Sequence, residues 1–469
     1  MSEGRSKISR RAFLRGSAIG AGTLILAACS PATPAPAEPA AEPTAVPPTD
    51  EPAEEPAEEP AEEPEPTEAP AEEPIELEFW HGWEGKDGDA MDAVVAMFME
   101  ANPNYTVTPV QGKFDDSIIT AISGGAPPDA ATTWGTTTIA QWGQSGVVVD
   151  LTDMMEAEGG VDEDKFYEAA IDVSRHDGRW YAMTVEIDSF GLLYNKAIFA
   201  EASVELPATA EELYQAAIDL TQVDDAGNVT QLGFSADKHA FENAAYAYGG
   251  RWWDRETGLP TANEEANIAA WSDLEALYQQ IDPTAAQAFE NQSLGWPLDN
   301  AFLGGTTAMK FNGDWYVMFA RDYAPDLDYG VMAYPAGGAN GVAGTSKVDG
   351  AVYAVPTGVK NTEASFNFVW WMGNSEEGSC SLQVAWANAS PFKTLANSPD
   401  CLPAPNYQGY IDIMSNEKMN IWPTIAVSAF YWDEFKSATG RVMFGEQSAE
   451  EALNDLQEKI LNELANVGA

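Results

Sequence analysis

Residues 75–80 read Ile-Glu-Leu-Glu-Phe-Trp and open the folded part of the chain. This alternation of apolar and acidic side chains is typical of a β-strand with one buried face. Helical periodicity follows over 91–101, a second strand pattern over 106–110, a helix over 115–123, and a Gly-Pro turn at 124–129 before a further strand. Alternating strands and helices predict an α/β fold with a mainly parallel sheet covered on both faces.

The folded part is long enough for more than one core. Residues 75–469 exceed what one compact core usually holds and suit two lobes of ordinary domain size. Thr-Ala-Glu-Glu at 209–212 and Ser-Ala-Glu-Glu at 448–451 are capping boxes, because a Ser or Thr stands three residues before a Glu. Each precedes an apolar helical pattern, so we expect two long helices to begin there.

The N-terminus carries targeting signals. Ser-Arg-Arg-Ala-Phe-Leu at 9–14 matches a twin-arginine signal, and Leu-Ala-Ala-Cys at 26–29 resembles a lipobox. The apolar run at 18–28 is too short for a transmembrane helix, which needs about twenty residues. We therefore expect residues 1–28 to be a signal peptide and Cys29 to carry lipid. The chain would then be exported and anchored to the outer face of the cytoplasmic membrane through that lipid only.

Residues 29–74 are expected to be a tether. They consist almost entirely of Pro, Ala, Glu and Thr, and Glu-Pro-Ala-Glu recurs from Glu51, Glu55 and Glu59. Such a segment has little apolar surface to bury, its glutamates repel one another, and its prolines favour extended backbone. We interpret it as a disordered spacer between the lipid and the folded lobes.

The composition excludes several functions. The chain has 23 Lys and Arg against 74 Asp and Glu, a formal net charge of −51, so we expect no nucleic-acid partner. With three cysteines, three histidines and no Cys-x-x-Cys or His-Glu-x-x-His spacing, we expect no metal and no cofactor. Disulfides persist outside the cytoplasm, so we expect Cys380 and Cys401 to pair.

Tryptophans next to polar residues point to a ligand. All fifteen lie beyond the tether, and several adjoin Asp, Glu, Asn or His in turn-like contexts. An aromatic ring can pack on the C–H face of a sugar while carboxylates and amides accept its hydroxyl protons. A single such tryptophan is more often a core residue, but their repetition favours a site for a neutral polyol.

The order and spacing of several motifs resemble a known family. They are the Gly-Gly-Ala-Pro-Pro-Asp turn at 124–129 followed by Trp134, residues 177–182 leading to 193–196, residues 305–309 with 312–315, residues 328–331 with Pro335, and residues 428–431. Together they resemble the extracellular solute-binding proteins of the sugar-binding group, close to the maltose-binding type, over nearly all of the chain from residue 75.

The resemblance implies a two-lobed periplasmic-binding-protein fold. Its α/β lobes would be joined by several hinge crossovers, with ligand in the cleft between them. The first lobe would comprise residues 75–187 and 345–374, and the second residues 188–344 and 375–469. The crossovers would then fall near 186–188, 345–347 and 374–375.

The resemblance also implies ligand-binding residues. Trp315 has the firmest context, Trp134 matches a first-lobe stacking ring, and Asp188 falls at the hinge carboxylate with Glu186 as the nearby alternative. The remaining matched residues are Tyr431 with its neighbour Trp432, Trp80, Trp83, Glu84 and His239. The family's Asp-Lys pair after the first strand is replaced here by Trp83-Glu84, which leaves the sugar open.

The function implied is that of a non-enzymatic receptor. The chain would be the substrate-binding lipoprotein of a carbohydrate ABC importer, acting as a monomer that delivers sugar to the importer's transmembrane subunits. Two other functions stay open. Aromatic rings and paired carboxylates would also serve a secreted glycoside hydrolase or lyase, and the acidity would favour a receptor for a cationic solute such as a polyamine.

Overall fold

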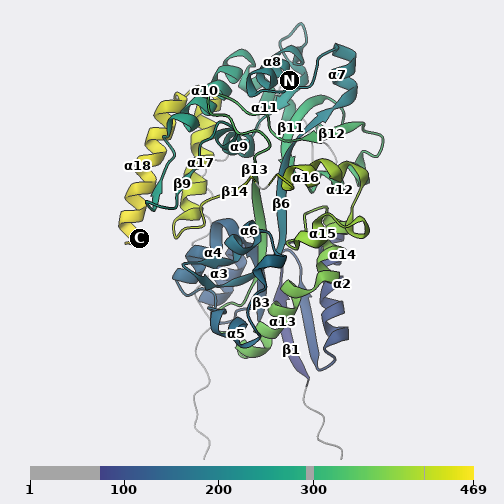
Figure 1. Ribbon diagram of the computed structural model, residues 1–469, viewed down its shortest axis with the longest axis vertical. Coiled ribbons are helices and arrows are strands. Elements are labelled where there is room, and N and C mark those ends of the chain that lie inside the picture. The colour runs from purple at the N-terminus through teal and green to yellow at the C-terminus, as the bar shows by residue number, and fades with distance from the viewer. Residues whose placement is uncertain (1–73, 292–299, 417, 469) are drawn as a thin grey trace, which may run out of the picture. The chain divides into compact units, whose positions relative to one another are not determined.

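Two long strands form the centre of a ten-stranded sheet. β6 (Ala182–Asn195) and β13 (Ser346–Ala354) pair antiparallel in the middle of the strand order β2-β1-β3-β13-β6-β11-β8-β7, and helices lie on either side of them in Figure 1. The other strands of this sheet are β1 (Ile75–Trp80), β2 (Tyr105–Val110), β3 (Ala130–Trp134), β7 (Gln222–Val223), β8 (Val229–Ser235), β11 (Thr307–Gly313), β12 (Tyr329–Met332) and β14 (Met419–Ile421).

The computed structural model describes residues 74–291, 300–416 and 418–468. The predicted signal peptide, the lipidation site Cys29 and nearly all of the predicted tether lie outside the described residues. Among the described residues, no helix is both long and apolar enough to cross a bilayer.

The sheet is mixed rather than mainly parallel, so that prediction was wrong. β1 runs parallel to β2 and β3, and β8 runs parallel to β11, as alternating strands and helices require. β6 and β13, however, pair antiparallel with β3, β11 and β12. These two strands pass from one half of the sheet to the other and run antiparallel to most of the strands that they meet, although β13 runs parallel to β14.

Separate cores on the two halves of the sheet make the fold two-lobed. In the first lobe, Phe79 and Val94 belong to a core on one sheet face, and Ile139 and Val352 belong to a core on the other. The first-lobe helices are α2 (Gly85–Ala101), α3 (Asp115–Ser123), α4 (Gly135–Gln144), α5 (Thr152–Ala157), α6 (Glu168–Ser174), α13 (Thr362–Asn374) and α14 (Glu376–Trp386).

The second lobe is likewise covered by helices on both faces. Its largest core includes Leu213, Trp271 and Leu453, and a second core includes Tyr316 and Tyr410. The second-lobe helices are α7 (Lys196–Ala202), α8 (Ala210–Asp219), α9 (Lys238–Ala247), α10 (Glu265–Gln280), α11 (Pro283–Asn291), α12 (Tyr316–Tyr323), α16 (Gln408–Met414), α17 (Ser428–Met443) and α18 (Ala449–Val467).

Short elements complete the described chain. They are the hairpins β4 (Arg175–His176) with β5 (Arg179–Trp180) and β9 (Trp253–Asp254) with β10 (Leu259–Pro260), the helix α15 (Lys393–Ala396), and the 3₁₀ turns η1 (Glu163–Lys165), η2 (Pro399–Cys401) and η3 (Pro405–Tyr407).

Both capping boxes begin helices as predicted. The Thr209 hydroxyl accepts the Glu212 backbone N–H at the start of α8, and Ser448 does the same for Glu451 at α18. In each box the glutamate side chain accepts a hydrogen bond from the backbone N–H of the cap residue. Donors that would otherwise be unpaired are satisfied, so local sequence sets these two starts.

The crossovers are visible as changes of strand partner. Residues 182–189 of β6 pair with β13, whereas residues 190–195 pair with β11 and β12. β13 in turn pairs with β14 at its start and with β3 at its end. The chain therefore passes between lobes within single strands, close to the crossovers expected at 186–188 and 345–347.

The expected crossover at 374–375 disagrees with the packing. Ser375 caps α14 immediately after α13, and α14 packs on α2. Leu382 and Trp386 belong to the first-lobe core together with Phe79. The chain leaves this core only after Trp386, where Ala389 forms a bridge with Ile187 of β6.

A disulfide joins α14 to the segment that follows it. Cys380 of α14 and Cys401 of η2 are bonded, with an S–S distance of 2.07 Å. Nearby, the Gln383 amide donates to the carbonyl of Cys401 at 2.8 Å. The first-lobe helix is thereby tied to the chain that continues into the second lobe.

Candidate ligand-binding site at the lobe crossover

Acidic side chains gather on one face of the two crossover strands. Glu186 and Asp188 are two residues apart in β6, so they point to the same side of the sheet. Asp349 of β13 lies directly opposite Asp188. Glu186 is 2 % exposed and Asp188 6 % exposed. Like charges in directly opposed positions are unfavourable, so these carboxylates need neighbours that offset them.

Backbone and amide donors supply part of that compensation. Asn388 donates its side-chain N–H to Asp188 Oδ1, and Glu186 Oε1 accepts the backbone N–H of Ala351 at 2.9 Å. A third buried carboxylate, Asp314, accepts the N–H groups of Ser189 at 3.2 Å and of Ala389 at 3.1 Å. Asp314 thus links β6, the end of β11 and the crossover segment after α14.

Burial raises the pKa of these carboxyl groups. The pKa of Asp188 rises from 3.8 to about 7, and the pKa values of Glu186 and Asp314 rise as well. Burial is the main cause for each, because a charged carboxylate loses its hydration there. A carboxyl group that is partly protonated near neutral pH can both donate to and accept from a sugar hydroxyl.

One buried cation faces this carboxylate cluster. Lys347 of β13 is 1 % exposed. Its ammonium lies 2.7 Å from Glu242 Oε2 of α9 and 3.3 Å from Asp349 Oδ2. Burial lowers the pKa of Lys347, but the two carboxylates outweigh burial, so its pKa lies above the usual value. The Thr136 hydroxyl of α4 also donates to Asp349, which extends the network into the first lobe.

Indole rings of the first lobe stand beside the cluster. Trp83, between β1 and α2, stacks on Trp386 with ring centres 4.4 Å apart and an interplanar angle of 19°. Trp134 at the end of β3 meets Trp83 edge to face at 6.2 Å and is 44 % exposed. β3 also pairs Trp134 with Ala351, two residues from Asp349. The first lobe therefore presents the exposed indole of Trp134, which packs on Trp83, which in turn stacks on Trp386.

Rings of the second lobe meet the same strands. Trp315 contacts Phe190 of β6 edge to face, with centres 5.2 Å apart. The indole lies against Gly313, where an added Cβ would come within 1.9 Å of it. Trp432 of α17 lies 5.7 Å from the His239 ring, which is itself 4.9 Å from Phe190.

The structure thus brings many of the predicted residues to the crossover strands. Those grouped there are Trp83, Trp134, Glu186, Asp188, His239, Trp315 and Trp432. Further members of the cluster were not predicted from the sequence, among them Asn388, Lys347, Asp349, Glu242 and Trp386. No local pattern marks them, although Asp314 does stand inside the Asn-Gly-Asp-Trp motif at 312–315.

Three predicted residues have other surroundings. Tyr431 is buried in the second-lobe core, where its hydroxyl donates to the Trp252 carbonyl at 2.9 Å. It is Trp432, one residue on, whose ring lies near His239. Trp80 donates from Nε1 to Glu78 at 2.6 Å and lies under the Lys113 ammonium. Glu84 is exposed immediately before α2.

A large cavity lies on the other face of the crossover strands. Its volume is about 1130 Å³, and Ile187 and Val348, which alternate with the acidic residues, line it. Residues of both lobes contribute, including an ion pair of 2.6 Å between Arg255 and Asp172. None of the predicted ligand-binding residues lines this cavity.

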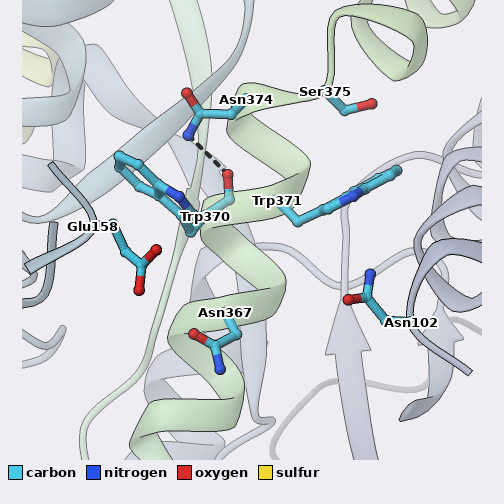
Figure 2. A pocket seen from close by; sticks show the side chains of 7 residues that line it. All are labelled: Asn102, Glu158, Asn367, Trp370, Trp371, Asn374 and Ser375. Carbon is cyan, nitrogen blue, oxygen red and sulfur yellow. Dashed lines mark hydrogen bonds between the residues drawn. The ribbon is translucent and has the colours of Figure 1, made fainter. Parts of the chain in front are cut away.

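A smaller hollow lies on the first lobe, away from the crossover. Figure 2 shows Trp370 and Trp371 projecting to opposite sides of α13, with Asn367 and Asn374 on the same helix. The hollow measures about 330 Å³, and the Asn374 amide donates back to the Trp370 carbonyl at 2.9 Å. It contains none of the predicted residues either.

No candidate metal centre emerges from residues 74–291, 300–416 and 418–468, because no three of their histidine, cysteine or carboxylate side chains are grouped to hold an ion.

Comparison with protein families and curated proteins gives consistent matches. The family model described as bacterial extracellular solute-binding protein matches residues 93–408. A putative binding protein of Brucella abortus is 24% identical over 363 residues, covering 72% of this chain and 86% of that protein. The maltotriose-binding protein of Pyrococcus abyssi is 21% identical over 394 residues, 82% of each chain. A maltooligosaccharide ABC transporter solute-binding lipoprotein of Streptococcus pneumoniae is 25% identical over 298 residues, 60% of this chain and 65% of that one.

Solved structures share the two-lobed fold. A mannotriose-bound protein, CpMnBP1, superposes with a TM-score of 0.73 at 21% identity, over 82% of this chain and 99% of its own. An ABC substrate-binding protein of Listeria monocytogenes in complex with cycloalternan gives a TM-score of 0.70 at 23% identity, over 84% and 99%. The sugar-binding protein MalE of Xanthomonas citri gives 0.68 at 18%, over 84% and 98%.

Proposed function

The chain belongs to the bacterial extracellular solute-binding protein family, and we propose that it captures a neutral sugar or short oligosaccharide and delivers it to an ABC importer. One observation carries the choice of ligand: indoles from both lobes stand beside buried carboxyl and amide groups at the crossover. Trp134 and Trp83 come from the first lobe, Trp315 and Trp432 from the second.

This arrangement matches the chemistry of a sugar. The C–H face of a pyranose packs on an indole, while its hydroxyls need both donors and acceptors close by. Asp188, Glu186 and Asn388 supply acceptors and donors at the strands that join the lobes. Named relatives and fold neighbours that bind maltotriose, maltooligosaccharide or mannotriose support the same class of ligand.

Ligand capture would work through lobe closure. A sugar that contacts rings of both lobes stabilises the conformation in which those rings are near each other, and it favours that conformation by its difference in affinity for the two states. β6 and β13 each pair with strands of both lobes. Small backbone rotations in these two strands would therefore change the angle between the lobes.

We further propose that the protein is a lipoprotein of the cell envelope. The twin-arginine motif, the lipobox ending at Cys29 and the Pro- and Glu-rich tether support export followed by lipid anchoring. The Streptococcus pneumoniae relative is itself named a lipoprotein. Lipid on Cys29 would keep the receptor close to the transmembrane subunits of its importer.

A binding role is favoured over catalysis. Glu186 and Asp188 lie on one strand and one face, among backbone donors and Asn388. A glycosidase instead places its two carboxylates on either side of the glycosidic bond that it cleaves. Incubation with the tightest sugar followed by chromatography should return that sugar unchanged. Cleavage products would instead support the hydrolase or lyase function.

Calorimetric titration tests the sugar assignment. The purified chain is titrated with a panel that includes maltotriose and mannotriose, and at least one sugar should bind. Trp315→Ala should lower its affinity about 100-fold or more, because the stacking surface is lost. Gly313→Ala should weaken binding about tenfold, since the new methyl group displaces the Trp315 ring.

The control is a glycine with free space around it. Gly440→Ala in α17 adds the same methyl group where no atom lies within 4 Å apart from the adjoining residues and the backbone of its own helix, and it should leave affinity unchanged. Absence of binding to every carbohydrate would overturn the sugar assignment. Equal affinity in Trp315→Ala and the unmodified chain would remove Trp315 from the site.

A further inference from the structure

His239 lies between aromatic rings at the start of α9. Its ring centre is 4.9 Å from Phe190 and 5.7 Å from Trp432. Asp237 caps the helix by accepting the His239 backbone N–H at 2.9 Å, which places the imidazole on the first turn. The residue as a whole is half-buried.

The hydrogen bond to Lys347 determines which nitrogen carries the proton. Lys347 Nζ lies 3.1 Å from His239 Nδ1. An ammonium group has three donors and no acceptor, so Nδ1 must accept and cannot carry hydrogen. The single proton of the neutral imidazole is then on Nε2. Glu242 at 2.7 Å and Asp349 at 3.3 Å keep the Lys347 ammonium charged.

We propose that Lys347 is a positioning residue that holds His239 as the Nε2–H tautomer, so that this N–H donates to an oxygen of the bound sugar. The proposal rests on the proposed function. Nδ1 is occupied by a lysine that is only 1 % exposed, so Nε2 is the ring nitrogen left to meet a ligand. The His239 ring centre lies 5.7 Å from that of Trp432, one of the proposed stacking rings.

The surrounding charges keep the imidazole neutral. Burial lowers the pKa of His239 most, Lys347 lowers it further, and Lys238 and Lys310 act in the same direction, while Asp237 opposes them. Glu242 and Asp349, the other charged groups of this network, both bind the Lys347 ammonium. The pKa of His239 therefore lies well below its usual value, and the donor should persist unchanged across neutral pH.

The donor complements the acceptors on β6. Carboxylates bind hydroxyl protons, whereas an N–H binds a hydroxyl or ring oxygen, so a neutral polyol can use both. A cationic solute at this end of the site would instead meet a donor and the nearby Lys347 ammonium. The Lys347 and His239 pair thus favours a neutral ligand over a polyamine.

Nitrogen NMR of the imidazoles tests the tautomer without any ligand. The chain has three histidines, so His239→Phe identifies the His239 signals by their loss. In the unmodified chain, His239 should show a protonated Nε2 and an unprotonated Nδ1 from pH 6 to pH 8. Lys347→Met should allow both tautomers and raise the His239 pKa, because a nearby cation that lowers it is removed. The double variant Lys347→Met with Glu242→Gln serves if the single variant does not fold.

A nearby lysine provides the matched control. Lys310→Met removes a cation that binds Ser235 at 3.1 Å rather than the imidazole, so the Nε2–H tautomer should remain. Lys347→Arg keeps a donor-only group and should restore the tautomer lost in Lys347→Met. A protonated Nδ1 in the unmodified chain, or an unchanged tautomer in Lys347→Met, would overturn the proposal.

Calorimetry then tests whether the donor reaches the sugar. His239→Phe and Lys347→Met should each weaken sugar binding about tenfold or more, and Lys310→Met should not. Unchanged affinity in His239→Phe would show that Nε2–H does not contact ligand and would overturn that part. If the unmodified chain binds no sugar, the proposed function fails, while the NMR result still decides the Lys347 contact independently.

Discussion

Asp188 is an acidic residue that is buried at the crossover between the lobes. It lies on the strand that joins the lobes, opposite Asp349, and its Oδ1 accepts from Asn388. The family resemblance of the motif that leads to residues 193–196 predicted this aspartate at the hinge. Its pKa, however, depends on neighbours that are distant in sequence, including Asn388 and Lys347.

Stability should therefore depend on pH through Asp188. Its pKa is about 7 in the folded chain and 3.8 ordinarily, so the folded state binds the proton more tightly. The stability that the folded state gains from binding this proton is fully present below about pH 4 and is lost as pH rises through 7. In urea denaturation, Asp188→Asn should gain in free energy of unfolding relative to the unmodified chain between pH 5 and 7, by at most about 1.4 kcal/mol per pH unit.

The exposed Asp326→Asn serves as the control and should show no such trend. Other buried groups contribute to the pH dependence of the unmodified chain, so the difference between variants is the informative quantity. A difference between Asp188→Asn and the unmodified chain that stays constant over this pH range would contradict the raised pKa.

At the scale of elements, local sequence signals determine where a helix begins but not which segments it packs against. The Thr209 and Ser448 boxes begin α8 and α18, because a cap satisfies backbone groups within four residues. The lobe boundary expected at 374–375 was wrong because it depends on a contact between segments that are distant in the sequence. α14 belongs to the first lobe through Trp386, which stacks on a tryptophan about 300 residues earlier in the chain, Trp83.

The disulfide between α14 and η2 should stabilise the fold. Cys380 and Cys401 are 21 residues apart, and closing such a loop reduces the entropy of the unfolded chain by an amount worth roughly 3 kcal/mol. Cys380→Ser with Cys401→Ser should lower the thermal midpoint by several degrees in a calorimetric scan. A reductant should lower the midpoint of the unmodified chain toward that value and leave the double variant unchanged. Equal midpoints for both chains would show that the bond does not contribute.

At the scale of the whole molecule, charge and topology are the two main features. At most 23 of the 74 acidic side chains can find a separate Lys or Arg partner, so a large negative excess remains. The two lobes are joined through β6 and β13, which are central strands of one sheet. A movement of these two strands therefore displaces both lobes.

Salt should stabilise this molecule. Repulsion within the acidic chain weakens as ionic strength rises, because the Debye length falls from about 30 Å at 0.01 M to about 3 Å at 1 M. The thermal unfolding midpoint should therefore rise between 20 mM and 500 mM NaCl. KCl at equal ionic strength should give a similar rise, since screening does not depend on the identity of the ion. A midpoint that stays constant or falls would mean that favourable ion pairs outweigh the repulsion.

The sequence by itself determined the features that rest on neighbouring residues or on composition. These are the α/β alternation, the two capped helices, the targeting motifs and the excess of acid, and a family resemblance added most of the aromatic residues of the candidate site. Only the tertiary structure decided that Trp432 rather than Tyr431 lies near His239, and that Lys347 meets a histidine 108 residues away. A strand or helix determines which side its residues face, whereas contacts across the fold depend on how distant segments pack, and no local pattern records that.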